Sequence, residues 1–429
     1  MADTATVPRG ETQETQLVRD LPIRTAWGIG AHSSVPGVSR SARRALLRGA
    51  AAGLAAVATA CAGDGHDVVA PLSGDPSAFR WVLPPGWAAP MVPADNPMSP
   101  AKVELGRRLF YDTRLSGNGA FACSSCHRQE FGFADARNIP LGSTGEPHPR
   151  NSPGIANSAY LRVFTWADPL TISLETQALV PMFGDRPVEL GLKGREIEML
   201  DRLRAVAIYR QLFPTAFPAD ADPFTVANVT RALATFQRTV IAVNAPYDRY
   251  KRGETGALSA AAVRGATLFF SPTLKCAECH RGTLFTVAST LETNDGSQSP
   301  FANNGLYNIG GDGSYPIGNQ GVYEHTGAPQ DVGKFRIPSL RNLEFTFPYM
   351  HDGSISTLED VVEHYARGGR AITTGPLAGD GSRSPIKDPR IAPLALSAQD
   401  KGDLVAFLRS LSDSALVRDT RFSNPWVAR

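Results

Sequence analysis

The sequence lacks the features that mark several large classes of protein. Its 43 Lys and Arg residues nearly balance 41 Asp and Glu residues, so the net charge of +2 gives no basic excess for binding nucleic acid. Nothing in the chain resembles a phosphate-binding loop or a hydrolytic triad. Four of the five cysteines stand in two Cys-x-x-Cys-His runs, which leaves no pairs for a disulfide framework.

Long hydrophobic runs and alternating apolar and polar residues are also scarce. The small-residue apolar run within residues 40–61 is too short for a spanning helix and is broken by Arg48, although an uncleaved anchor stays open. At 429 residues and 42% hydrophobic content, the chain can bury two cores. Because few stretches alternate as strands do, we expect an all-α fold.

Two pentapeptides have the spacing that attaches c-type haem. They are Cys123-Ser-Ser-Cys126-His127 and Cys276-Ala-Glu-Cys279-His280. In such a run the cysteines form thioether bonds to the haem vinyl groups and the histidine ligates the iron. A redox dithiol or half of a zinc site uses the same spacing of cysteines, but two copies favour haem. We therefore predict two covalently bound c-type haems.

The fifth cysteine, Cys61, ends a segment with the form of an export signal. Residues 40–61 have an Arg-containing start, a short Ala/Gly/Leu core and small residues before Cys61. This predicts a periplasmic protein with Cys61 as a candidate lipid-anchor site. The pair Arg43-Arg44 resembles a twin-arginine signal, but haem c is attached to unfolded chains outside the cytoplasm, so we favour the general export route.

Apolar residues recur at helical spacing in three places. Ser99 and Pro100 suit the start of a helix over residues 101–112. Residues 225–243 predict a second, amphipathic helix. Ser397 caps a third, whose apolar face should close over the second haem.

The same step from glycine to leucine precedes both haem motifs, at Gly106 and at Gly265. This predicts two cytochrome c-like domains related by internal duplication, with long ordered loops such as residues 289–333. The breaker-rich stretch 244–253 marks the boundary between them. The predicted parts are an export signal at 1–61, a linker at 62–89, domains at 90–245 and 246–415, and a tail at 416–429.

The tract from Phe345 to Tyr365 resembles the bacterial di-haem cytochrome c peroxidase and MauG superfamily, and the resemblance covers roughly residues 90–412. It implies that His351 lies in the second haem pocket and that the sixth ligand of that haem follows fourteen residues later. This ligand is methionine in the peroxidases and tyrosine in the MauG/MbnH-like branch; here the position holds Tyr365. Met350 and His364 remain rival ligands. A phenolate favours oxidised iron, whereas a thioether favours reduced iron.

A second tract, from Trp166 to Gly191, resembles the family's distal pocket. The resemblance implies four roles: Trp166 as electron relay between the haems, Gln177 and Pro181 as the lining of the peroxide pocket, and Glu189 as acid/base. A carboxylate suits that role, because heterolysis of the O–O bond needs a proton moved between the two oxygens. Small insertions in the tract leave Glu175 or Asp185 as alternatives.

The run Arg150-Asn151-Ser-Pro153 resembles the family's Arg-Asn-x-Pro motif, but the switchable histidine ligand that should stand eight residues before the asparagine is Ser143. The nearest histidine, His148, is only three residues away. We read it as a residue behind the ligand shell or at the surface, and the first haem as permanently five-coordinate.

By the same resemblance, Asn151 and the backbone carbonyls of Thr346 and Pro348 match an inter-haem calcium site. Ligation by oxygen alone suits a hard cation. We therefore expect a calcium ion beside the two haems.

These features imply a periplasmic enzyme in which hydrogen peroxide reacts at the haem on His127. Two oxidising equivalents, shared through Trp166 with the haem on His280 and Tyr365 as a bis-Fe(IV) state, would then oxidise a protein partner. The loop 303–323 looks closer to MbnH, which implies a tryptophan target. One alternative is a peroxidase that draws electrons from a small cytochrome. A non-enzymatic alternative is a di-haem electron carrier with both irons six-coordinate.

Overall fold

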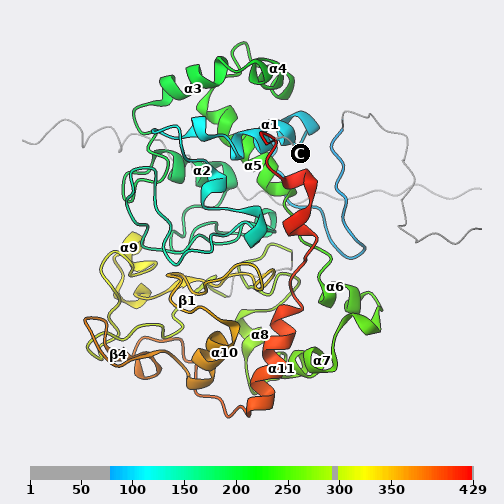
Figure 1. Cartoon of the computed structure of the whole chain (residues 1–429). Coiled ribbons are helices and arrows are strands. Elements are labelled where there is room, and N and C mark those ends of the chain that lie inside the picture. Colours follow the sequence, from blue (N-terminus) through cyan, green and yellow to red (C-terminus); the bar gives the residue numbers. More distant parts are fainter. Residues whose placement is uncertain (1–77, 292–297, 428–429) are drawn as a thin grey trace, which may run out of the picture. The chain divides into compact units, whose positions relative to one another are not determined.

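The computed structural model describes residues 78–291 and 298–427, and their regular structure is mainly helical (Figure 1). The predicted export segment 40–61, with Cys61, lies outside the described residues. All described residues belong to one compact unit, Pro71–Arg429. Within the described ranges, no helix has the length and apolar character needed to cross a membrane.

In the N-terminal half, α1 (Pro100–Phe110) packs against α5 (Val226–Thr239). Ser99 and Thr225 begin these helices, because each side-chain oxygen accepts a hydrogen bond from a backbone N–H of the first turn. Gly106 permits the close crossing, since a Cβ there would lie 1.9 Å from a carbonyl oxygen of α5. The other helices of this half are α2 (Leu174–Phe183), α3 (Glu196–Arg204) and α4 (Ala207–Ala216).

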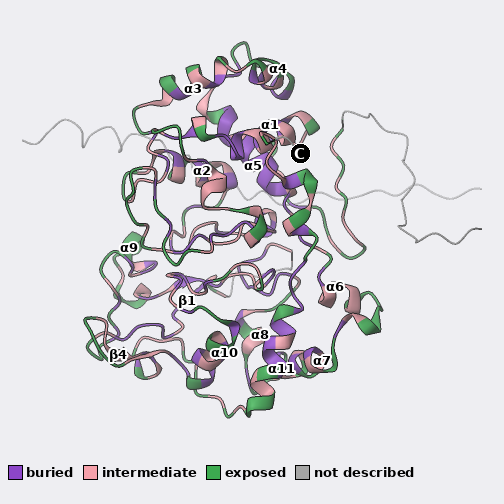
Figure 2. Cartoon of the chain, viewed as in Figure 1, coloured by how far each residue is buried: buried purple, intermediate pink, exposed green. Residues whose placement is uncertain are grey.

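The C-terminal half has a matching pair, α7 (Ala260–Phe269) packed against α11 (Ala398–Arg409). Gly265 stands at this crossing, where a Cβ would again lie 1.9 Å from a carbonyl oxygen of the partner helix. Buried residues gather along both helix pairs (Figure 2). The other helices are α6 (Pro246–Lys251), α8 (Cys276–Cys279), α9 (Tyr323–Thr326) and α10 (Leu358–Arg367).

Strands are few and short among the described residues. Strand β1 (Phe301–Ala302) pairs antiparallel with β2 (Phe335–Arg336), and β3 (Ala371–Ile372) pairs antiparallel with β4 (Gly379–Asp380). Single turns of 3₁₀ helix cover Thr113–Leu115, Cys123–Ser125, Gln129–Phe131, Ser158–Tyr160, Thr255–Ala257, Pro329–Asp331, Gly381–Arg383, Leu416–Arg418 and Thr420–Phe422. The fold is therefore helix-dominated, and the predicted all-α class is confirmed.

The three predicted helices are present as α1, α5 and α11, and the differences lie at their ends. The helix expected over residues 225–243 stops at Thr239, because Val240 leaves the helical conformation with φ −78° and ψ 80°. The stretch 244–253, read as a breaker, contains helix α6, because Pro246 suits a first helical position. Pro246 therefore stands at the start of α6 instead of ending regular structure.

The two halves are connected by more than the chain between them. At their contact, the backbone N–H of Arg336 donates to the Trp166 carbonyl at 2.7 Å. The C-terminal tail also returns to the N-terminal half (Figure 1), where the Tyr111 hydroxyl donates to the Phe422 carbonyl at 2.7 Å and the indole N–H of Trp426 donates to the Arg108 carbonyl at 3.0 Å. The predicted duplication and domain bounds stay predictions, although the two glycine crossings agree with them.

Candidate active site

The first cysteine-histidine motif holds its histidine in one orientation. His127 Nδ1 lies 2.9 Å from the Phe133 carbonyl oxygen. Because a carbonyl can only accept, Nδ1 carries the proton and Nε2 keeps its lone pair for a metal. Burial lowers the pKa of His127, which favours the neutral ring.

The second motif repeats this arrangement on α8. His280 Nδ1 lies 3.0 Å from the Phe285 carbonyl oxygen, and burial lowers the pKa of His280 to about 4. Phe133 and Phe285 both adopt left-handed backbone conformations, with φ 63° and 54°. Such conformations are uncommon for bulky residues, and here each occurs in the residue whose carbonyl fixes the histidine.

Each motif opens on a cavity. The first cavity, of about 380 Å³, is lined by Cys123, Cys126 and His127. The second cavity, of about 260 Å³, is lined by Cys276, Cys279 and His280. Since one water needs only about 10–15 Å³ measured in the same way, each cavity has room for a group far larger than a few waters. Paired thiols and a histidine nitrogen in each cavity are the donor set that c-type haem requires.

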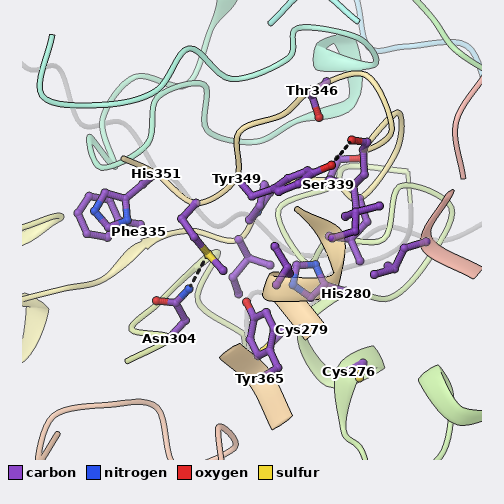
Figure 3. Close-up of a pocket in the computed structure, with 18 of the residues that line it drawn as sticks. Cys276, Cys279, His280, Asn304, Phe335, Ser339, Thr346, Tyr349, His351 and Tyr365 are labelled. Atoms are coloured by element: carbon purple, nitrogen blue, oxygen red, sulfur yellow. Dashed lines mark hydrogen bonds between the residues drawn. The ribbon is translucent and has the colours of Figure 1, made fainter. Parts of the chain in front are cut away.

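A buried orphan atom in the second cavity also fits a bound group. His351 lines this cavity and is 4% exposed, and its Nε2 has no hydrogen-bond partner among the described residues. Leaving such an atom unpaired in a protein interior is costly. Its ring stacks on Phe335, with centroids 3.4 Å apart, and burial lowers the pKa of His351 to about 4. Figure 3 shows the two rings side by side.

Of the three candidate sixth ligands of the second haem, two line the second cavity. Tyr365, on α10, turns its ring toward the cavity near His280 (Figure 3), and burial raises its pKa to about 12. Met350 lines the same cavity, with its Sδ 3.4 Å from Asn304 Nδ2. His364 is not among the lining residues, and its Nε2–H donates to the Asn304 carbonyl at 3.1 Å.

Seven residues line both cavities and so form a dividing wall. They are Asn151, Ser152, Pro153, Gly154, Leu161, Trp166 and Arg336. The indole N–H of Trp166 donates to the Asn151 carbonyl at 2.7 Å, and the Arg336 guanidinium lies 5.5 Å from the centroid of the Trp166 ring. These two contacts fix the indole within the wall.

The distal tract lines the first cavity with Gln177 and Pro181 of α2 and with Glu189. The two alternative carboxylates lie elsewhere. Glu175 pairs with Arg238 at 2.7 Å, and Asp185 pairs with Lys193 at 2.5 Å on the exposed side; neither is among the lining residues. Of the three carboxylates considered from the sequence, only Glu189 can meet a molecule in the first cavity.

His148 also lines the first cavity, which the sequence did not predict. Its Nε2 lies 3.3 Å from Glu189 Oε1, and its Nδ1 accepts the Arg150 backbone N–H at 3.2 Å. The reading of His148 as a residue behind the ligand shell or at the surface stays a prediction, and the structure adds its contact with the candidate acid/base. Its closeness in sequence to Asn151, a wall residue, was the available signal.

The proposed calcium ligands line the same cavity. Asn151, Thr346 and Pro348 all line the second cavity. The Asn151 carbonyl already accepts from Trp166, and its side-chain N–H donates to the Arg137 carbonyl at 3.1 Å. Among the described residues, no group of three His, Cys, Asp or Glu side chains could hold a metal ion. The calcium site depends on amide and carbonyl oxygens and stays a prediction.

The chain is similar in sequence to several known proteins. A sequence family described as di-haem cytochrome c peroxidase matches residues 100–256. The chain is 38% identical to the cytochrome-c peroxidase IdrP1 of Denitromonas iodatirespirans, over 75% of this chain and 84% of that protein. It is 34% identical to the methylamine utilization protein MauG of Methylorubrum extorquens, over 74% of this chain and 80% of that protein.

A solved structure resembles the fold as a whole. It is described as a MauG-like protein associated with microbial copper homeostasis, and it is 46% identical with a TM-score of 0.79. The match covers 82% of this chain and all of that one. The di-haem peroxidase BthA of Burkholderia thailandensis, 22% identical with a TM-score of 0.58, shares the fold.

Proposed function

The chain belongs to the di-haem cytochrome c peroxidase and MauG family, and on that premise we propose that it uses hydrogen peroxide to oxidise a protein partner in the periplasm. Its relatives are oxidoreductases, so the chain is an enzyme and the reading as a simple electron carrier falls away. Export through residues 40–61 and a lipid anchor at Cys61 belong to the proposal.

The observation that carries the proposal is the phenol of Tyr365 in the cavity of His280. When bound, the haems supply the redox chemistry, taking two oxidising equivalents from peroxide. The cysteine pairs would hold them covalently, and Nε2 of His127 and of His280 would ligate the irons. An oxygen ligand from Tyr365 would favour the oxidised metal, so this centre would retain an oxidising equivalent rather than an electron.

Residues of the first cavity would transfer the proton that must move between the two oxygens of peroxide. Glu189 is the base that takes the first peroxide proton at Oε1 and returns it to the leaving oxygen as water forms. His148, whose Nε2 lies 3.3 Å from that oxygen, orients the carboxylate. Gln177 and Pro181 shape the pocket around the peroxide, and Trp166 in the dividing wall lies on the route between the cavities.

The partner is proposed to be a small periplasmic protein that is oxidised at tryptophan. Support comes from the 46% identity to a MauG-like protein whose description links it to copper homeostasis. Incubating the enzyme and peroxide with small proteins encoded beside it, followed by intact-mass measurement, identifies the partner by the oxygen it gains or the hydrogen it loses. A small cytochrome that only becomes oxidised would instead indicate an electron donor.

A second candidate function has its own support. Met350 lines the same cavity as Tyr365, and a thioether ligand there would suit a cytochrome c peroxidase that reduces peroxide with electrons from a small cytochrome. The 38% identity to IdrP1 favours the same alternative. The two functions therefore differ by which of two neighbouring side chains binds the second iron.

A pair of substitutions separates them. We expect the diferric protein to show one high-spin and one low-spin haem, and to develop a near-infrared band on adding peroxide without prior reduction. Tyr365→Phe should abolish the band, because the phenol oxygen is the proposed ligand, whereas the matched variant Met350→Leu should retain it. Loss of the low-spin spectrum in Met350→Leu, together with activity only after half-reduction, would establish the peroxidase alternative.

A further inference from the structure

A line of aromatic rings leads away from the second cavity. Phe335 and His351 line the cavity and stack with centroids 3.4 Å apart and planes 8° from parallel. Tyr315 lies behind them, 6.2 Å from Phe335 and 6.4 Å from His351. Tyr307 follows, 5.4 Å from Tyr315. These separations are those of rings in contact, so no aliphatic gap interrupts the line.

The two tyrosines differ in what accepts their protons. The Tyr307 hydroxyl donates to Asp352 Oδ2 at 2.6 Å, whereas the Tyr315 hydroxyl donates to the side-chain oxygen of Asn303 at 2.7 Å. A carboxylate can take a proton and an amide oxygen cannot. Burial raises the pKa of Tyr307, so its phenol is protonated and can lose an electron readily only if a nearby base receives the proton.

We propose that Tyr307 is a redox-active tyrosine that receives an oxidising equivalent from the second cavity. The inference rests on the proposed function, because the oxidant is the peroxide-oxidised haem of that cavity. One electron would leave Tyr307 and pass through Tyr315 and the Phe335–His351 pair to the second cavity, where a bound haem would accept it. The phenolic proton moves to Asp352, and a neutral tyrosyl radical remains.

The charged residues around Tyr307 favour loss of its proton together with its electron. They also place the oxidised tyrosine near the protein surface, where a partner can reach it. The Arg370 guanidinium lies 5.9 Å from the Tyr307 ring centroid and disfavours positive charge on it, which couples electron loss to proton loss. Asp352 and Arg370 are partly exposed. The partner protein, bound at this face, supplies one electron to the Tyr307 radical, and Asp352 returns the proton to the phenolic oxygen, which restores Tyr307.

The structure supplies a matched control in Tyr209. Its hydroxyl also donates to a carboxylate oxygen at 2.6 Å, on Asp112, but its ring contacts are Phe213 and Trp426 in the N-terminal core. Tyr209 lines neither cavity. Like Tyr307, Tyr209 therefore has a carboxylate that can accept its proton, but no line of aromatic rings connects it to the second cavity.

The test is electron paramagnetic resonance of the complete di-haem protein, frozen after peroxide is added without a partner. We expect a tyrosyl radical that is lost in Tyr307→Phe and at least halved in Asp352→Asn, while Tyr209→Phe keeps it. The near-infrared band should persist several-fold longer in Tyr307→Phe, because the oxidised second haem can no longer take an electron from Tyr307.

A radical unchanged in Tyr307→Phe, or no tyrosyl radical in the unmodified protein that shows the band, overturns the inference and leaves the proposed function standing. Absence of the band itself defeats the proposed function.

Discussion

At the scale of single residues, two backbone carbonyls orient the histidines that are proposed to bind iron. The carbonyls of Phe133 and Phe285 hold Nδ1 of His127 and His280, so each ring presents its other nitrogen to a cavity. Both phenylalanines adopt left-handed conformations, which cost free energy in bulky residues. Strain of this kind at both motifs is expected where ligand orientation matters more than local stability.

Glu189 carries a prediction at this scale. Replacing Glu189 by Gln keeps the shape of the side chain but removes the base, so the rate of reaction with peroxide should fall by about 10²- to 10⁴-fold. Stopped-flow absorption of the diferric protein measures that rate. Thermal stability should be nearly unchanged, since Glu189 is a partly exposed residue.

Asp185→Asn is the control for this substitution. Asp185 is exposed and pairs with Lys193 outside the cavity, so its loss should leave the rate as it was. Equal losses in the two variants would mean that overall charge, and not a positioned base, governs the reaction.

At the scale of elements, the two halves use one device to bring helices together. A glycine on the helix before each haem motif meets a carbonyl oxygen of the crossing helix, α1 on α5 and α7 on α11. The second crossing also shapes the cavity, because Leu404 and Leu408 of α11 line it. The position of α7 against α11 is therefore tied to the pocket of the second haem.

Gly265→Ala tests that link. Its Cβ would lie 1.9 Å from the Asp403 carbonyl oxygen, so α7 must shift, at a cost of about 1–3 kcal/mol in the free energy of unfolding. Denaturant unfolding measures the cost, and the absorption of the second haem should change while that of the first does not.

Gly402→Ala, within α11 and with open space around its Cβ, is the comparison. It should be neutral or stabilising by up to about 1 kcal/mol, because alanine favours the helix over glycine. If Gly265→Ala proved as stable as Gly402→Ala, the close crossing would not be a constraint.

At the scale of the whole described unit, the C-terminal tail joins the halves a second time. After α11 the chain returns to the N-terminal core, where Trp426 contacts Tyr209 and donates to the Arg108 carbonyl. Arg108 and Arg114 also lie about the indole face, with their guanidinium carbons 5.3 and 5.5 Å from the ring.

Trp426→Ala should therefore destabilise the N-terminal half more than the C-terminal half. We expect a loss of about 2–4 kcal/mol, somewhat below the usual cost of removing a fully buried tryptophan, because Trp426 is partly exposed. Thermal unfolding followed at the absorption of each haem resolves the halves. Val427→Ala, at a side chain 62% exposed, should have little effect, and an equal loss there would show that the tail is not a specific clamp.

Features that depend on neighbours in sequence were determined by the sequence itself. The two haem motifs, the caps at Ser99 and Ser397, and the helix-dominated class follow from local spacing and local hydrogen bonding. The resemblance to the family likewise led to Tyr365 by counting along one tract. A short-range pattern needs no knowledge of which distant segments meet.

The tertiary structure decided which side chains lie in each cavity and which ones pair elsewhere. The chain path places His148 beside Glu189, brings Met350 into the cavity of Tyr365, and turns Glu175 away to pair with Arg238. Each of these outcomes is set by contacts between segments distant in sequence, where burial and partner geometry, and not residue spacing, select the position of a side chain. The dividing wall around Trp166 exists for the same reason: residues from both halves of the chain must pack together before two cavities can share it.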